Sequence, residues 1–241
     1  NNRISPLIGT RKYSKPFMQI IETGHIAYIE IKSFLTTKVE EKQEYLKALE
    51  DFFIEKEKKM ARCAWAEGSP LYRDYHDHEW GKPQFDSQKL FEKLCLEGQQ
   101  AGLSWITVLQ KRENYRQAFY HFDPQKIAQM TDEDINQCMQ NAGLIRHRAK
   151  LEAIVKNAKA YLAMEKCGEN FSRFIWSFVD GQPQVNDVPD LTMVPAQTAV
   201  SVALSKALKK RGFVFVGPTT CYAFMQSMGL VNDHWNQCCC K

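Results

Sequence analysis

The chain has 241 residues, of which 44% are hydrophobic and 25% charged, and its net charge is +4. This composition allows one full core plus an appendage, and the modest charge permits nucleic-acid binding only where basic side chains cluster. No apolar run is long enough to cross a bilayer and no signal-peptide pattern begins the chain, so we expect a cytoplasmic protein without a membrane partner.

Eight cysteines are present, but their spacing argues against a secreted disulfide scaffold. Cys95 and Cys138 lie in helical patterns beside apolar residues, where reduced cysteine behaves as a small hydrophobe. The adjacent triplet at 238–240 suits a metal or a reducing compartment better than a disulfide framework.

The chain divides into an accessory segment, residues 1–59, and a main domain, residues 60–241. Strand-like runs at 17–21 and 26–34 flank turn-forming residues, which predicts a small β-hairpin. A charged helix is expected at about 37–59. Because a lone hairpin is marginal in water, the segment must pack on its own helix, on the main domain or on a partner. It is therefore a candidate interaction or dimerisation element.

Two pairs of metal-ligand residues lie at opposite ends of the main domain. Cys63 and His76 are separated by twelve residues, and His234 and Cys238 by three. Together they make a Cys2His2 set, which suits a tetrahedral zinc with no open position for water. The competing interpretation is that Cys63 is a core thiol and His76 an ordinary polar group, and the neighbouring cysteines could replace Cys238.

A helix is predicted from Asp86, as N-cap, toward Trp105. Steps of four, three and four residues put four side chains on one inward stripe: Leu90, Leu94, Glu97 and Ala101. A buried carboxylate is costly unless it is hydrogen-bonded, so Glu97 marks either a functional site or an internal ion pair.

Two further helices are predicted at 131–142, with a capping box at its start, and at about 149–164. Gly143 and the basic connector 144–148 join them. This layout is that of a helix-hairpin-helix, which offers main-chain N–H groups and a helix N-terminus to a phosphate. An ordinary helical hairpin with a solvated basic loop is the alternative. Residues 206–212 form a second basic cluster, which equally suits a solvated helix end.

Six motifs resemble the 3-methyladenine DNA glycosylase I (Tag-type) family. They are MARCAW at 60–65, YRDYHDHEWG at 72–81, LEGQQAGLSW at 96–105, GLIRHR at 143–148, KKRGF at 209–213 and GLVNDH at 229–234. The resemblance covers residues 60–241 and leaves the first 59 residues outside the family pattern.

The resemblance implies a mainly all-α helix-hairpin-helix DNA glycosylase domain with a structural zinc, preceded here by the hairpin-plus-helix segment. It also implies monofunctional hydrolysis of the N-glycosidic bond of 3-methyladenine in alkylated double-stranded DNA, as in base-excision repair. The implied zinc ligands are Cys63, His76, His234 and Cys238, and the implied base pocket contains Glu97, Tyr75 and Trp105, with Trp65 and Trp80 nearby.

These residue types suit the chemistry. Adenine methylated at N3 is cationic in DNA and leaves as a neutral base, so no strong general acid is required. Trp105 and Tyr75 can stack on a cationic ring, and Glu97 can accept its hydrogen bonds or stabilise developing sugar charge. Core packing is the alternative for Trp80.

DNA contacts are expected from the predicted hairpin and from the second basic cluster. The residues concerned are Gly143, Leu144, Arg146, Arg148, Lys209 and Arg211. Leu103 is a candidate wedge into the base stack, although a leucine at this position equally suits the core.

Family members of the wider helix-hairpin-helix class place an aspartate about twenty residues past the hairpin, and none occurs between Arg148 and Asp180. We therefore expect a substrate range confined to cationic bases. Two other functions remain open at this point. One is a glycosylase that also cleaves the abasic strand through Lys150 as a Schiff base, and the other is a zinc-stapled DNA-binding module without catalysis.

Overall fold

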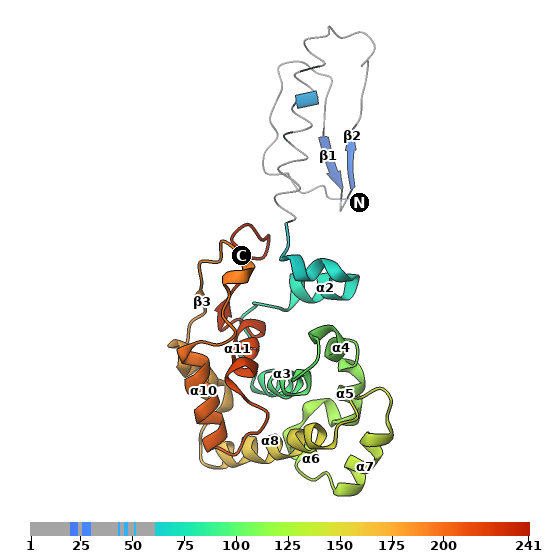
Figure 1. Ribbon diagram of the computed structural model, residues 1–241, viewed down its shortest axis with the longest axis vertical. Coiled ribbons are helices and arrows are strands. Elements are labelled where there is room, and N and C mark those ends of the chain that lie inside the picture. The colour runs from blue at the N-terminus through green and yellow to red at the C-terminus, as the bar shows by residue number, and fades with distance from the viewer. Residues whose placement is uncertain (1–19, 24–25, 30–42, 44–45, 48–50, 52–60) are drawn as a thin grey trace, which may run out of the picture. The chain divides into compact units, whose positions relative to one another are not determined.

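The computed structural model describes residues 20–23, 26–29, 43, 46–47, 51 and 61–241 (Figure 1). Contacts within the chain divide it into two compact units, Asn1–Lys58 and Lys59–Lys241. Within the described residues, no helix is both long and apolar enough to cross a membrane.

The first unit contains an antiparallel hairpin of β1 (Ile20–Thr23) and β2 (Ile26–Ile29). Thr23 pairs directly with Ile26, so Glu22 and Thr23 belong to β1 rather than to the predicted turn. Of the helix predicted at 37–59, the described residues 43, 46, 47 and 51 are helical, and the rest lie outside the described residues.

The second unit is built mainly from helices, which confirms the expectation of a mainly helical fold (Figure 1). Its longer helices are α2 (Pro70–His78), α3 (Ser87–Gln100), α7 (Asp132–Gln140), α8 (Arg148–Lys166), α10 (Ala199–Lys210) and α11 (Pro218–Ser227). Shorter ones are α4 (Trp105–Leu109), α5 (Arg112–Ala118), α6 (Pro124–Ile127) and α9 (Phe171–Trp176), with 3-10 turns η2 (Ala64–Gly68), η3 (Tyr120–Phe122), η4 (Ser177–Val179) and η5 (Leu191–Met193). Strands β3 (Gln184–Val185) and β4 (Val231–Asn232) form a short parallel pair.

Helix α3 lies in the middle of the second unit, between α11 on one side and α4 on the other, with α8 packed against it (Figure 1). The Asp86 side chain accepts the Lys89 N–H at 2.8 Å, as the predicted N-cap requires. The apolar side chains of α3 join the buried core of the unit.

The prediction that this helix runs on toward Trp105 is wrong. Helix α3 ends at Gln100, Ala101 is exposed, and Trp105 begins the separate helix α4. The turn between them uses Gly102 at φ 77°, a left-handed conformation that glycine adopts without steric cost.

Helices α7 and α8 follow the predicted bounds within two residues. Thr131 and Asp134 make the expected capping box at the start of α7. Residues 141–147 connect the two helices, and Gly143 lies so close to Asn114 that an added Cβ would be 2.8 Å from its side chain. The connector is therefore packed against the neighbouring helix α5.

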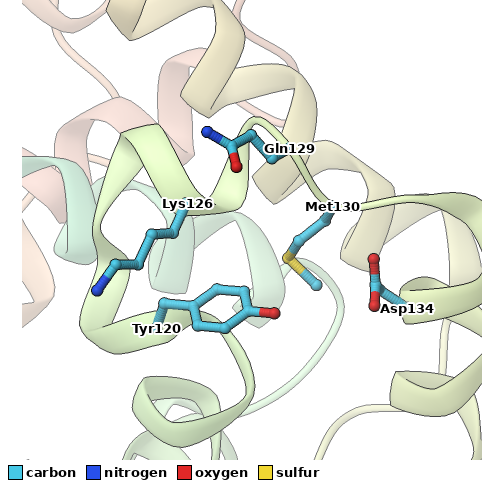
Figure 2. Close-up of a pocket in the computed structure, with 5 residues that line it drawn as sticks. All are labelled: Tyr120, Lys126, Gln129, Met130 and Asp134. Carbon is cyan, nitrogen blue, oxygen red and sulfur yellow. The ribbon is translucent and has the colours of Figure 1, made fainter.

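Between α6 and α7 the surface is hollowed into a cavity of about 300 Å³ (Figure 2). Its lining residues are Tyr120, Lys126, Gln129, Met130 and Asp134. The adjoining residues 120–122 all have positive φ, between 51° and 58°. This hollow shares no residue with the predicted site.

Candidate functional site

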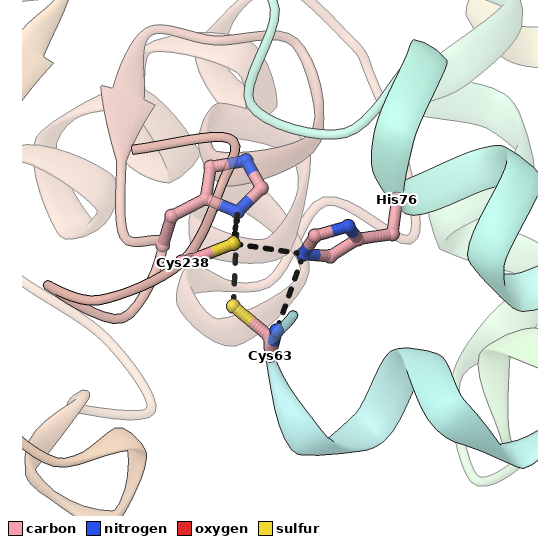
Figure 3. Close-up of side chains that lie close together, drawn as sticks. Cys63, His76 and Cys238 are labelled. Carbon is pink, nitrogen blue, oxygen red and sulfur yellow. Dashed lines mark hydrogen bonds between the residues drawn. The ribbon is translucent and has the colours of Figure 1, made fainter. Parts of the chain in front are cut away.

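Four metal-ligand side chains meet in the interior of the second unit: Cys63, His76, His234 and Cys238. The Cys238 sulfur lies 3.4 Å from both His76 Nε2 and His234 Nδ1, and the Cys63 sulfur lies 3.7 Å from His234 Nδ1. Figure 3 shows Cys63, His76 and Cys238 pointing toward one another. Since zinc–sulfur and zinc–nitrogen bonds of roughly 2.3 and 2.1 Å span about 3.6 Å across a tetrahedral edge, the cluster could hold a metal ion.

Neighbouring groups orient each ligand atom. Asp77 contacts His76 Nδ1 at 2.8 Å and is itself bound by Arg62, which leaves Nε2 of the histidine toward the sulfurs. The Trp80 carbonyl lies 3.2 Å from His234 Nε2, which leaves Nδ1 toward the cluster. Such outer contacts fix the tautomer of a metal-bound histidine.

Glycine is required where the chain passes over this cluster. At Gly81, with φ 77°, an added Cβ would lie 2.7 Å from His234 Nε2. A larger residue would therefore displace the histidine as well as strain the backbone.

Glu97 is buried, with 4% of its side chain exposed, and lies 3.2 Å from the Lys93 ammonium one turn earlier on α3. Burial raises the pKa of the Glu97 carboxyl, while the positive charge of Lys93 opposes that rise. The internal ion pair, one of the two interpretations of this acid, is therefore present. It is surrounded by aromatic groups rather than by a plain apolar core.

Tyr75 and Trp105 form an aromatic box around the Lys93 ammonium. The Lys93 Nζ atom donates to Tyr75 Oη at 2.6 Å and lies 3.3 Å from the Trp105 ring centroid, and the two rings are 5.5 Å apart. The buried Trp105 Nε1–H has no hydrogen-bond partner among the described residues. A buried donor without a partner costs about 1–3 kcal/mol, so this N–H is an unusual feature of the aromatic box.

The other two tryptophans of the predicted base pocket, Trp65 and Trp80, lie toward the metal-ligand cluster. Trp80 packs on His234, with ring centroids 4.5 Å apart, and stacks on His76. Trp65 contacts both Trp80 and, at 6.3 Å, Tyr75. Trp65 therefore bridges the cluster and the aromatic box, and Trp80 supports the histidines.

The predicted DNA-contacting residues fall in three places. Leu103 is 41% exposed, in the turn between α3 and α4 that follows the buried acid. In the connector, Arg146 is exposed and Leu144 is buried, and Arg148, the first residue of α8, is exposed. The backbone N–H groups of Gly143 and Leu144 donate within the chain, to Asn141.

The second basic cluster lies at the far end of α8 from the connector. Arg211 binds Glu169, three residues past the end of α8, at 2.6 and 2.8 Å. Since α8 rises about 1.5 Å per residue, the two basic regions lie roughly 27 Å apart along the helix. Lys209 is exposed at this end.

Sequence reasoning did not predict that two lysines, Lys93 and Lys150, are buried within the part of the chain that the structure describes. Lys93 lies four residues before Glu97 and three after Leu90, so helix spacing alone would have placed it on the inward stripe. Lys150, 6% exposed, donates from Nζ to the carbonyls of Gln99 and Ala101 at 2.8 and 2.6 Å. It therefore fastens the start of α8 to the end of α3, and the sequence carries no signal for that pairing.

Comparison with known proteins identifies the family to which this chain is similar. A family model described as methyladenine glycosylase matches residues 65–241. The chain is 78% identical over 180 residues to DNA-3-methyladenine glycosylase of Haemophilus influenzae, an alignment that covers 75% of this chain and 97% of the relative. It is 62% identical over 181 residues to DNA-3-methyladenine glycosylase 1 of Escherichia coli, with the same shares covered.

Solved structures give the same result. A crystal structure of 3-methyladenine DNA glycosylase I (TAG) superposes with a TM-score of 0.73 at 61% identity, and covers 74% of this chain and 98% of its own. A TAG structure from Staphylococcus aureus, described as the structural basis of 3-methyladenine recognition, gives a TM-score of 0.72 at 44% identity, with 75% and 96% covered. The chain belongs to the methyladenine glycosylase family.

Proposed function

We propose that this protein removes 3-methyladenine from alkylated DNA by hydrolysing its N-glycosidic bond, as the first step of base-excision repair. The names of the closely similar relatives support this activity. The observation that carries it to a site is the buried Glu97 carboxylate beside the rings of Tyr75 and Trp105. An acid beside aromatic faces is suited to a cationic purine.

In this site the flipped base stacks on Trp105 and Tyr75, and Glu97 accepts hydrogen bonds from its exocyclic amine or from a protonated ring nitrogen. When the glycosidic bond breaks, its electron pair neutralises the cationic ring. Water then adds to the sugar carbon as hydroxide and releases one proton. The charge already on the base weakens the bond, so no strong acid is needed.

The metal-ligand cluster is proposed to hold a structural zinc. Cys63, His76, His234 and Cys238 would bind it, and the S···N distances of 3.4–3.7 Å support that donor set. Four protein ligands leave no position for water, so the ion would fix the chain rather than take part in hydrolysis.

We propose α7, the connector and α8 as a helix-hairpin-helix element that binds the phosphate backbone. The first-turn N–H groups of Arg148 and Ala149 have no partner within the helix and point along a favourable dipole. The exposed Arg146 and Arg148 add positive charge. Because the N–H groups of Gly143 and Leu144 already donate internally, the start of α8 is the better phosphate site. Lys209 and Arg211 would make a separate contact.

Leu103 is proposed as the wedge that enters the vacated base stack, since it is exposed in the turn beside the acid. Residues 1–59 stay an accessory segment in this proposal, because the family match begins after them. Comparing the excision rate and solution mass of the full chain with those of a chain starting at Met60 tests their role.

Strand cleavage through Lys150 is disfavoured by its contacts. A Schiff-base lysine must present a free amine to the sugar, whereas Lys150 Nζ is held by two carbonyls at the end of α3. A DNA-binding module without catalysis would have no need of a buried acid in an aromatic box, so monofunctional hydrolysis is the function proposed.

The test is release of free 3-methyladenine from methylated duplex DNA by wild type, Glu97→Gln and Glu92→Gln. Glu92 lies on the same helix and pairs with Arg116, so it is a matched control. We expect release by wild type and by Glu92→Gln, and a loss of about tenfold or more in Glu97→Gln, roughly 1.4 kcal/mol of transition-state stabilisation. No release by folded wild type would refute the proposed function, and full activity of Glu97→Gln would refute the site.

A further inference from the structure

The position in which a stacked cationic base would be held already contains a cation. The Lys93 ammonium lies 3.3 Å from the Trp105 ring centroid and 4.7 Å from that of Tyr75, and it contacts the carboxylate of Glu97 at 3.2 Å. A purine stacked on the face of Trp105 would lie about as far from that ring as the Lys93 ammonium does. The ammonium and the base therefore cannot occupy this place together.

We propose that Lys93 is an internal competitor of the base, a cation that fills the aromatic box and neutralises Glu97 until a cationic base takes its place. This inference rests on the proposed function, because it takes the cationic N3-methylated base as the incoming ligand.

The exchange favours charged bases over neutral ones. A cationic base restores the attraction to the Trp105 face and to the Glu97 carboxylate that the departing ammonium gives up. A neutral purine restores neither, so its entry would leave a buried carboxylate without a counter-charge, which is costly. Lys93 therefore sets a threshold that ordinary adenine does not pass.

The lysine has the means to leave. Its side chain is a flexible four-carbon stem, and burial lowers the pKa of its ammonium to about 8, against the opposing attraction of Glu97. Glu79 and Arg112 form a neighbouring ion pair, with a contact of 2.7 Å. The repulsion of the Lys93 ammonium by Arg112 is stronger than its attraction to Glu79, which also favours its departure.

The test compares binding of two small ligands by calorimetry at pH 6.5, below the pKa of Lys93, so that its ammonium is protonated. The 3,9-dimethyladeninium ion carries a permanent positive charge on the same ring system as the lesion, and 9-methyladenine is its neutral counterpart. The proteins are full-length wild type, Lys93→Met, Lys93→Arg and Lys89→Met. Methionine keeps an unbranched stem without charge, arginine keeps the charge, and Lys89 is an exposed lysine one turn earlier on α3.

We expect Lys93→Met to bind both ligands about tenfold or more tightly than wild type, because neither ligand then has to displace the ammonium from Glu97 and Trp105. In every variant the cation should bind more tightly than 9-methyladenine, and Lys93→Arg and Lys89→Met should retain the weak binding of wild type. Unchanged or weaker binding of both ligands by Lys93→Met, or a gain of the same size in Lys89→Met, would overturn the inference.

Control measurements test whether a change in binding comes from the loss of the ammonium. Circular dichroism checks the fold of each variant, and Lys93→Gln provides a second uncharged side chain that must behave as Lys93→Met does. Release of 3-methyladenine by wild type is measured in parallel, so that a failure of the proposed function is distinguished from a failure of the role given to Lys93.

Discussion

Glu97 and Lys93 lie one turn apart on α3, and each is buried beside a charge of opposite sign. Isolated buried charges are costly, so removing one partner of such a pair is more damaging than removing both. The contribution of this pair to the free energy of unfolding therefore depends on pH more strongly than that of an exposed pair would.

The pKa of Lys93, lowered by burial from 10.5 to about 8, predicts a rise in stability at alkaline pH. Between pH 8 and 10.5 the unfolded chain keeps a proton that the folded chain has lost, so the free energy of unfolding increases with pH. Relative to Lys93→Met, wild type should gain roughly 2 kcal/mol between pH 7.5 and 9.5. Urea unfolding of both proteins measures this difference, in which the titrations of groups remote from the Lys93–Glu97 pair cancel. A difference that stays constant over this range would contradict the lowered pKa.

At this scale the sequence predicted the acid but not its partner. Helix spacing identified Glu97 as inward-facing because a carboxylate interrupts an apolar stripe. The same spacing applies to Lys93, but a lysine is ordinarily assigned to solvent since its long stem reaches the surface. The aromatic box depends on Tyr75 from α2, whose distance from α3 no local pattern encodes.

At the scale of elements, the connector and the pocket are parts of one hydrogen-bonded unit. The Ile145 N–H donates to Tyr115 Oη, which donates to the Gln99 side chain at 3.1 Å, and Gln99 in turn donates to the Lys150 carbonyl. This chain of contacts joins the start of α8 to the end of α3, two residues past Glu97. DNA bound at the connector would therefore be held at a fixed distance from the acid.

The arginines of the connector should contribute to DNA binding through charge alone. We expect Arg146→Ala and Arg148→Ala each to weaken duplex binding by a factor that does not depend on the DNA sequence. Each variant should also reduce the slope of log K against log salt concentration by about one. The effect of Arg146 should be the larger, because Arg148 also pairs with Glu152 at 3.5 Å. Titrations over a range of salt concentrations measure the slope. Lys89→Ala alters an exposed lysine at the start of α3, outside both basic regions, and is the control. An equal loss in this variant would contradict a localised contact.

Helix bounds followed from caps and periodicity at α7 and α8, where Thr131 and the residues of the connector carry strong local signals. Periodicity did not predict where α3 ends, because that end depends on Gly102 and on the distant Lys150, which binds the last carbonyls of the helix. Tertiary contacts of this kind override a continuous local pattern.

Over the whole second unit, the Cys2His2 cluster joins residues 63–76 to residues 234–238. Local spacing grouped each pair of ligands, and the chemistry of a Cys2His2 shell suggested that the two pairs belong together, as the family resemblance also implied. Neither pair alone offers a complete tetrahedral shell, so the four-ligand set exists only in the folded chain.

Removal of the proposed zinc should destabilise this unit. We expect a chelator, or Cys63→Ser, to lower the melting temperature by about 5 °C or more, and the variant to hold less than one zinc per chain. Cys167→Ser alters an exposed cysteine outside the cluster and should retain both the metal and the stability. Melting curves with metal analysis measure these effects. An unchanged melting temperature after complete metal removal would contradict the structural role.

The sequence separation within the cluster also bears on how the chain folds. Cys63 and His234 are 171 positions apart, and His76 and Cys238 are 162 apart. Closing loops of this length costs entropy that is repaid only once the intervening helices have packed. Capture of the proposed zinc would consequently be a late event on the folding pathway. Metal retention would then report that both ends of residues 61–241 have reached their native positions.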